Sequence, residues 1–110
     1  MNVSRLGDRL VKVTLVGRLD ASGVDRVETR FVAQIVPAGN NAIVDLSQVD
    51  FVASLGLRML VSAAKSLKVR QAKLALFGVQ PPVLQVFEAV ALDKIIPICS
   101  EEADALAAVG

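Results

Sequence analysis

The sequence contains no histidine, tryptophan or tyrosine, and only one cysteine among its 110 residues. Without histidine the chain cannot form a Ser-His-Asp triad, a Cys-His pair or a histidine-ligated zinc site. The single Cys99 excludes an internal disulfide and any site built from several cysteines. Its place at the end of the apolar run 95–99 predicts a small core residue. We therefore expect a protein that is not an enzyme and that uses no cofactor and no metal.

The chain also has almost no excess of charge of either sign, because 12 Lys and Arg residues are balanced by 11 Asp and Glu residues. Nucleic-acid binding requires a clustered basic face, which this balance does not indicate. The densest basic cluster is Lys65, Lys68, Arg70 and Lys73. It lies around the end of a predicted helix, where cations complement the helix dipole, and we interpret it as a solvated helix end.

Long apolar runs are missing as well. The sequence has neither a run of about 18 apolar residues nor the pattern of a signal peptide. We expect a cytoplasmic protein without membrane insertion, folded as one domain over residues 1–110. Hydrophobic residues make up 54% of the chain and aromatic residues 4%, which predicts a core of Val, Leu, Ile and Ala. The apolar surplus indicates an exposed contact patch or simply an alanine- and valine-rich composition.

Strands and helices alternate in the predicted order. Apolar and β-branched runs predict strands over residues 2–6, 10–16, 42–46, 73–77 and 95–98. Apolar residues three and four apart predict helices that open near Ser22, Ser54, Pro81 and Ser100. Strands joined by helices pair in parallel, and only the first hairpin strand runs the other way. The predicted fold is α/β, with a mixed sheet of four or five strands packed with four helices.

Four boundaries of these elements are also predicted. Gly17 is expected to end the second strand, and Ser22 or Asp20 to cap the first helix. Residues 47–53 are expected to form a connection before the second helix. Ser100 is expected to cap the terminal helix.

Functional groups of open α/β sheets gather beyond the carboxyl ends of the parallel strands. Three segments reach that edge, residues 17–20, 50–54 and 78–80, and each precedes a helix N-terminus that favours an anion. Ser54 is the notable hydroxyl among them. By position alone it is an N-cap or a functional serine, and the two roles are compatible.

The segment 45–57, Asp-Leu-Ser-Gln-Val-Asp-Phe-Val-Ala-Ser-Leu-Gly-Leu, resembles the signature of STAS domains in anti-sigma-factor antagonists. The turn Gly17-Arg18-Leu19-Asp20 resembles the Gly-x-Leu-Asp turn of the same family. The resemblance implies a STAS-like fold over the whole chain and a phosphoacceptor role for Ser54. It implies partner contacts by the surrounding residues Asp20, Asp50, Ala53, Leu55, Gly56 and Leu57.

The partner that the resemblance implies is an anti-sigma factor that doubles as a serine kinase, with a serine phosphatase reversing the modification. This assigns the chain to bacterial signalling and transcription regulation. Two positions differ from the family pattern: Ala53 replaces an acidic residue and Leu55 a serine or threonine. They favour an alternative, a non-switching STAS scaffold subunit of a stress-sensing complex or of a lipid ABC transporter.

Overall fold

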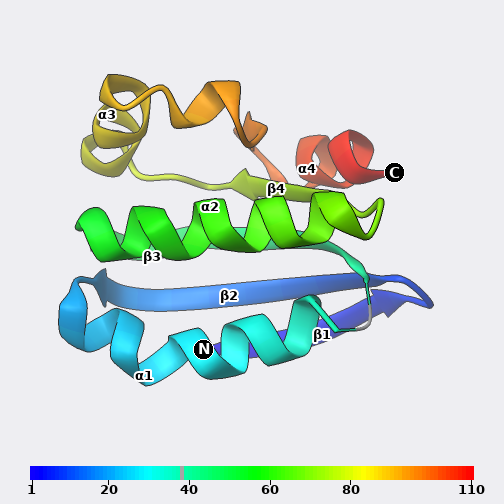
Figure 1. The fold of residues 1–110 in the computed structure, drawn as a ribbon. Coiled ribbons are helices and arrows are strands. Elements are labelled where there is room, and N and C mark those ends of the chain that lie inside the picture. The colour runs from blue at the N-terminus through cyan, green and yellow to red at the C-terminus, as the bar shows by residue number, and fades with distance from the viewer. Residues whose placement is uncertain (38) are drawn as a thin grey trace.

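The structure is a computed structural model that describes residues 1–37 and 39–110. Its strands are β1 (Asn2–Gly7), β2 (Leu10–Leu19), β3 (Asn41–Val52), β4 (Leu74–Phe77) and β5 (Ile98–Cys99). Its helices are α1 (Ala21–Ile35), α2 (Ser54–Val69), α3 (Pro81–Ala89), the short 3-10 helix η1 (Leu92–Lys94) and α4 (Glu102–Val109). The five strands form one sheet in the order of the chain (Figure 1). β1 is antiparallel to β2 and the other pairs are parallel, so the predicted mixed α/β sheet is confirmed.

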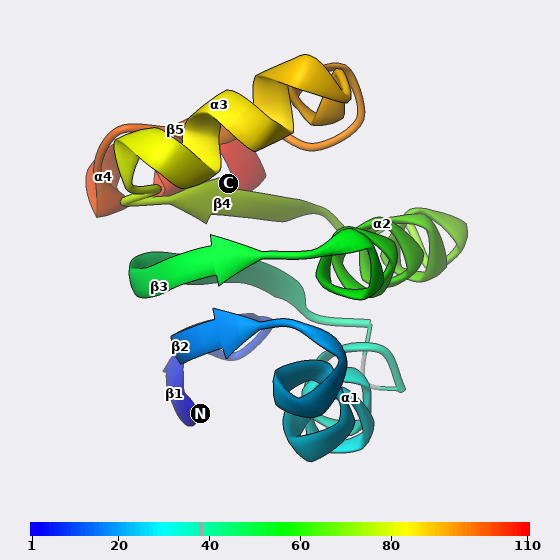
Figure 2. The ribbon, with the colours of Figure 1, turned by 90° about the vertical axis from the view of Figure 1, so that its left-hand side faces the viewer.

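The sheet carries helices on both faces (Figure 2). α1 and α2 lie side by side on one face and enclose the main core, to which α3 also contributes. Val13, Val44, Phe31 and Leu60 are fully buried there. α4 covers part of the other face over a smaller cluster, formed by Ile43, Ala75, Phe77, Ala105 and Val109. Aliphatic side chains dominate both cores, as the scarcity of aromatic residues predicts.

β2 and β3 are longer than the sequence pattern predicts. The prediction that Gly17 ends the second strand is wrong, because β2 continues to Leu19. Gly17 has a φ of +89°, which allows β2 to bulge and then to resume its pairing with β3. The predicted connection is also wrong, since residues 47–52 belong to β3. The polar residues of this segment face outward while Val49 and Val52 are buried, so a strand can form here despite the polar residues in it.

Two predictions near the C-terminal end are wrong as well. β5 begins at Ile98 rather than at residue 95, because Pro97 has no N–H to donate to the ladder and η1 precedes it. The N-cap of α4 is Glu101 rather than Ser100, since the chain is still extended at Glu101 (φ −130°, ψ 162°). Cys99 is half-buried, and burial raises the pKa of its thiol. In the described part of the chain, no helix has the length and apolarity needed to cross a membrane.

Candidate functional site

Ser54 is the first residue of α2 and its side chain is exposed. The N-cap is Ala53, which keeps an extended conformation with φ −97° and ψ 179°. The interpretation of Ser54 as an N-cap is therefore wrong, because the serine lies one position inside the helix. Among the residues that the structure describes, no side chain caps α2 and no acidic side chain lies in its first turn. The first N–H groups of α2 thus lack a side-chain acceptor, and their positive partial charge lies beside Ser54.

The start of α2 is held against the end of β2. The backbone N–H of Ala53 donates to the carbonyl of Leu19 at 3.0 Å, directly after the pairing of Leu19 with Val52. Gly56 is buried at this contact. A Cβ on Gly56 would lie 2.7 Å from the Leu19 carbonyl oxygen and 3.0 Å from Cγ1 of Val52. Only glycine permits this close approach, which determines where α2 begins relative to the sheet.

A stacked arginine lies next to this helix start. The guanidinium carbon of Arg18 is 4.2 Å from the ring centroid of Phe51, a cation–π contact. Nε of Arg18 also pairs with Asp20 at 3.3 Å. Asp20 caps α1 by accepting a hydrogen bond from the Gly23 N–H at 2.9 Å. This bond, and after it the bond from Arg18, hold the pKa of Asp20 below its ordinary value, so Asp20 is ionised at neutral pH.

The third predicted segment, residues 78–80, does not lie beside Ser54. β4 ends at Phe77, which pairs with Asp45. Gln80 donates its side-chain amide N–H to the carbonyl of Ser47 at 2.9 Å. β3 continues from Ser47 to Val52, which corresponds to roughly 17 Å at the usual rise per residue of a strand. Two of the three predicted segments therefore meet at Ser54, because β3 extends beyond β4.

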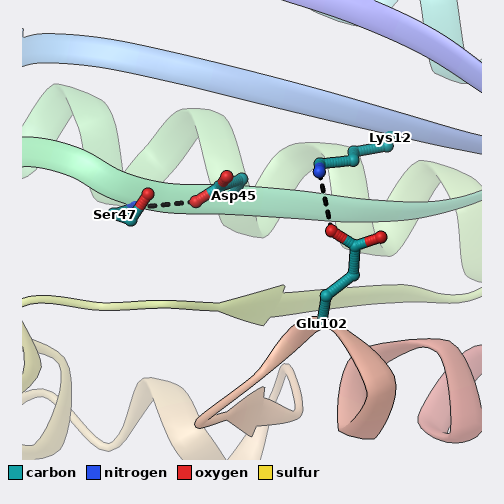
Figure 3. Close-up of polar contacts among 4 residues, drawn as sticks. All are labelled: Lys12, Asp45, Ser47 and Glu102. Carbon is teal, nitrogen blue, oxygen red and sulfur yellow. Dashed lines mark hydrogen bonds and ion pairs between the residues drawn. The ribbon is translucent and has the colours of Figure 1, made fainter.

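Several polar contacts of this fold are structural (Figure 3). Asp45 accepts a hydrogen bond from the backbone N–H of Ser47 at 2.9 Å, within the Asp-Leu-Ser segment. Nζ of Lys12 lies 2.6 Å from a carboxylate oxygen of Glu102 and joins β2 to the first turn of α4. The hydrogen bond to Glu102 raises the pKa of Lys12 above its ordinary value, against a smaller effect of burial. Within residues 1–37 and 39–110, no group of acidic or cysteine side chains is arranged to hold a metal ion.

The profile of the STAS domain family matches residues 4–105 of the chain. The chain belongs to the STAS domain family. It is 32% identical over 94 residues to the anti-sigma-B factor antagonist of Listeria monocytogenes. The matched residues cover 86% of this chain and 82% of that protein. The predicted family is thereby confirmed.

Solved STAS structures share the fold. An anti-sigma factor antagonist from Mycobacterium paratuberculosis has a TM-score of 0.85 and 24% identity, covering 98% of this chain and 91% of that one. Unphosphorylated SpoIIAA has a TM-score of 0.75 and 18% identity, covering 96% of this chain and 91% of that one. SpoIIAA of Bacillus in its phosphorylated form has a TM-score of 0.72 and 17% identity, covering 97% of this chain and 96% of that one.

In this STAS domain, the residues implied for partner contact occupy different environments. Leu55 is 42% exposed directly beside the serine, and Asp50 is exposed on β3. Ala53 and Leu57 are half-buried, and Leu57 packs against the main core. Gly56 is buried and offers little surface to a partner. Its position explains the glycine as a packing requirement rather than as a contact.

Sequence reasoning missed two residues of this candidate site, Arg18 and Phe51. Phe51 is 40% exposed. The two residues are neighbours because the end of β2 pairs with the end of β3, which the pattern of the sequence does not contain. We call Arg18, Phe51, Ser54 and Leu55 together the Ser54 surface.

Proposed function

We propose that the chain is an anti-sigma-factor antagonist whose Ser54 surface binds an anti-sigma factor with serine-kinase activity. Phosphorylation of Ser54 then releases the partner. The observation that carries this proposal is an exposed serine on the first turn of α2, where the described chain supplies no side-chain cap. The name of the Listeria relative supports the partner class, and a phosphorylated form is known for SpoIIAA.

A phosphate on Ser54 is compatible with the fold of this chain. It adds roughly −1.5 to −2 charges at neutral pH. The N-terminus of α2 stabilises such a charge by about 0.3–1 kcal/mol. Arg58 lies four residues further along α2, the spacing at which opposite charges on a helix pair. The modification therefore acts on the complex and leaves the free domain folded.

In the complex, the same phosphate is unfavourable. Phe51 and Leu55 are 40% and 42% exposed, and a partner that covers them removes water from Ser54 as well. Removing water from a phosphate that faces a surface fitted to a neutral serine costs several kcal/mol. This is of the same order as the cost of removing one partner of a buried charge pair at an interface. Since about 1.4 kcal/mol changes affinity tenfold, one modification is enough to dissociate the partner.

A second candidate function is favoured by Ala53 and Leu55, the two departures from the family pattern. In this alternative, the chain is a non-switching scaffold subunit of a stress-sensing complex or of a lipid ABC transporter. The Ser54 surface is then covered permanently, and Leu55 adds apolar contact area to it.

The two functions are separated by variants of the full chain. The anti-sigma factor is identified by affinity capture from the native cells, and its affinity is measured by calorimetry. Ser54→Asp is expected to weaken binding by roughly a hundredfold or more, whereas Ser54→Ala leaves it within about threefold. Ser62→Asp is the matched control, because Ser62 is exposed two turns along α2 and receives the same charge.

Equal affinities of Ser54→Asp and Ser54→Ala would refute the switch. Incubation of the chain with its captured partner and ATP is expected to add one phosphate at Ser54, detected by mass spectrometry. A partner that binds but leaves Ser54 unmodified, or capture of a transporter ATPase, would favour the scaffold.

A further inference from the structure

A basic groove lies at the end of α2 opposite to Ser54. One part, of about 390 Å³, is lined by the C-terminal part of α2, the start of β4 and the segment after η1. A second part, of about 270 Å³, adjoins it and shares Ala64, Lys68 and Ile95. We call both parts together the lysine groove, after the charged residues that line it, Lys65, Lys68, Lys73 and Lys94.

A solvated helix end does not account for this groove. Lys68 lies in the last turn of α2, where a cation complements the helix dipole. Lys73 follows the end of the helix, and Lys94 comes from η1, a different element. No carboxylate side chain is among the described residues that line either part, so the lining side chains give the groove a net positive charge. The sequence interpretation of the cluster is therefore incomplete, since it contains no role for Lys94.

The floor of the lysine groove is apolar. Ala64, Leu74 and Pro97 contribute to it, and Ile95 is 53% exposed there. Gln71 also lines the groove and has a φ of +61°, at the position after α2 where glycine is preferred. This conformation belongs to the end of α2, where the N–H of Gln71 donates to the carbonyl of Lys68 and the N–H of Ala72 donates to the carbonyl of Leu67.

We propose that the lysine groove binds an acidic amphipathic segment of a second protein partner. Apolar side chains of that segment pack on Ile95 and Leu74, and its carboxylates pair with the flanking lysines. The apolar residues line a hollow of about 390 Å³ rather than a flat face, and this concave shape favours a peptide over a lipid bilayer. Charge complementarity makes the segment acidic.

The lysine groove and the Ser54 surface can be occupied at the same time. Lys68 lies fourteen residues after Ser54 on α2, which corresponds to about 21 Å along the helix. The residues that line the groove and those of the Ser54 surface therefore do not overlap, so each can hold a separate partner. The inference extends the proposed function: the domain acts as an adaptor that holds an anti-sigma factor at one end of α2 and a second protein at the other.

The test uses the full chain and a fluorescein-labelled 14-residue peptide with leucines at helical spacing and glutamates between them. A matched peptide carries lysine in place of glutamate. Fluorescence anisotropy is expected to detect binding of the acidic peptide only, with affinity falling as salt rises. The double variant Lys68→Gln/Lys94→Gln is expected to bind about tenfold more weakly, from the loss of two exposed ion pairs. Arg26→Gln/Arg30→Gln on α1 is the control with the same change in charge and is expected to bind normally.

A second pair of variants tests the apolar floor. Ile95→Ser is expected to weaken peptide binding, whereas Val16→Ser, whose valine is 58% exposed on β2, leaves it unchanged. Ser54→Asp is also expected to leave peptide binding unchanged, so the result is independent of the anti-sigma factor. Equal binding of both peptides, or normal binding by Lys68→Gln/Lys94→Gln, overturns the proposal. Binding to phosphatidylserine vesicles without peptide binding, or a dimer that this double variant dissociates, also overturns it.

Discussion

Replacing Gly56 by alanine tests the packing that holds α2 against the sheet. Alanine is favoured over glycine in a helix by about 1 kcal/mol, so propensity alone predicts stabilisation. The structure predicts the opposite, because the new Cβ would lie 2.7 Å from the Leu19 carbonyl oxygen and 2.9 Å from the Leu19 Cβ. Relief requires that α2 and β2 move apart, which strains the 3.0 Å bond from Ala53 N–H to Leu19.

The magnitude follows from three contributions. Overpacking costs about 1–3 kcal/mol and the weakened hydrogen bond about 1 kcal/mol, against the gain in propensity of about 1 kcal/mol. The net loss in the free energy of unfolding is about 1–3 kcal/mol, equivalent to a fall in Tm of roughly 4–12 °C for a domain of this size.

Urea and thermal unfolding of Gly56→Ala measure this loss. Gly7→Ala is the matched control, because a Cβ there would lie 3.9 Å from the nearest atom, an ordinary contact. It is expected to change stability by less than about 0.5 kcal/mol. A Gly56→Ala variant as stable as the original chain would show that the close approach of α2 to β2 is not required for the fold.

Three further predictions concern strain and pH. Glycine adopts the positive φ of +61° at Gln71 without the steric penalty of a Cβ, so Gln71→Gly is expected to raise the free energy of unfolding in urea by about 0.5–1 kcal/mol; a loss would mean that the glutamine side chain supports the fold. The raised pKa of Lys12 means that its contact with Glu102 stabilises the fold below the ordinary lysine pKa, a contribution that is lost as the pH rises through the raised value. The Lys12→Met variant is therefore expected to have a lower Tm near pH 7 and a shallower fall of Tm above about pH 10. Identical alkaline slopes of Tm in the variant and the original chain would contradict this. The lowered pKa of Asp20 implies stabilisation above the ordinary carboxyl pKa that is lost as the pH falls through the lowered value. Asp20→Asn is expected to reduce the loss of Tm between about pH 6 and about pH 2, and an unchanged acid slope would contradict the assignment.

The elements that could be predicted from the sequence are those with a strong local pattern. Phe31 and Ile35 of α1, and Leu60 and Leu67 of α2, recur at helical spacing and are fully buried. The order of strands and helices then leaves few ways to form a sheet, so the mixed α/β fold could be derived. The position of Ser54 at the start of a helix was also contained in the local sequence, because residues 45–57 form a continuous family motif.

Tertiary structure decided how far the strands extend and which side chains meet. Polar residues interrupt the apolar pattern of residues 47–52, and this segment is a strand because residues 16–19 of β2 pair with it on both sides of the bulge at Gly17. The same pairing places Arg18 on Phe51, although the two residues are 33 positions apart in the sequence. Lys94 joins Lys68 in one groove for a similar reason, since η1 and α2 come together only in the folded chain. A periodic pattern reports which face of an element is buried, whereas register, bulges and the meeting of distant side chains depend on pairing energies between segments that are far apart in the sequence.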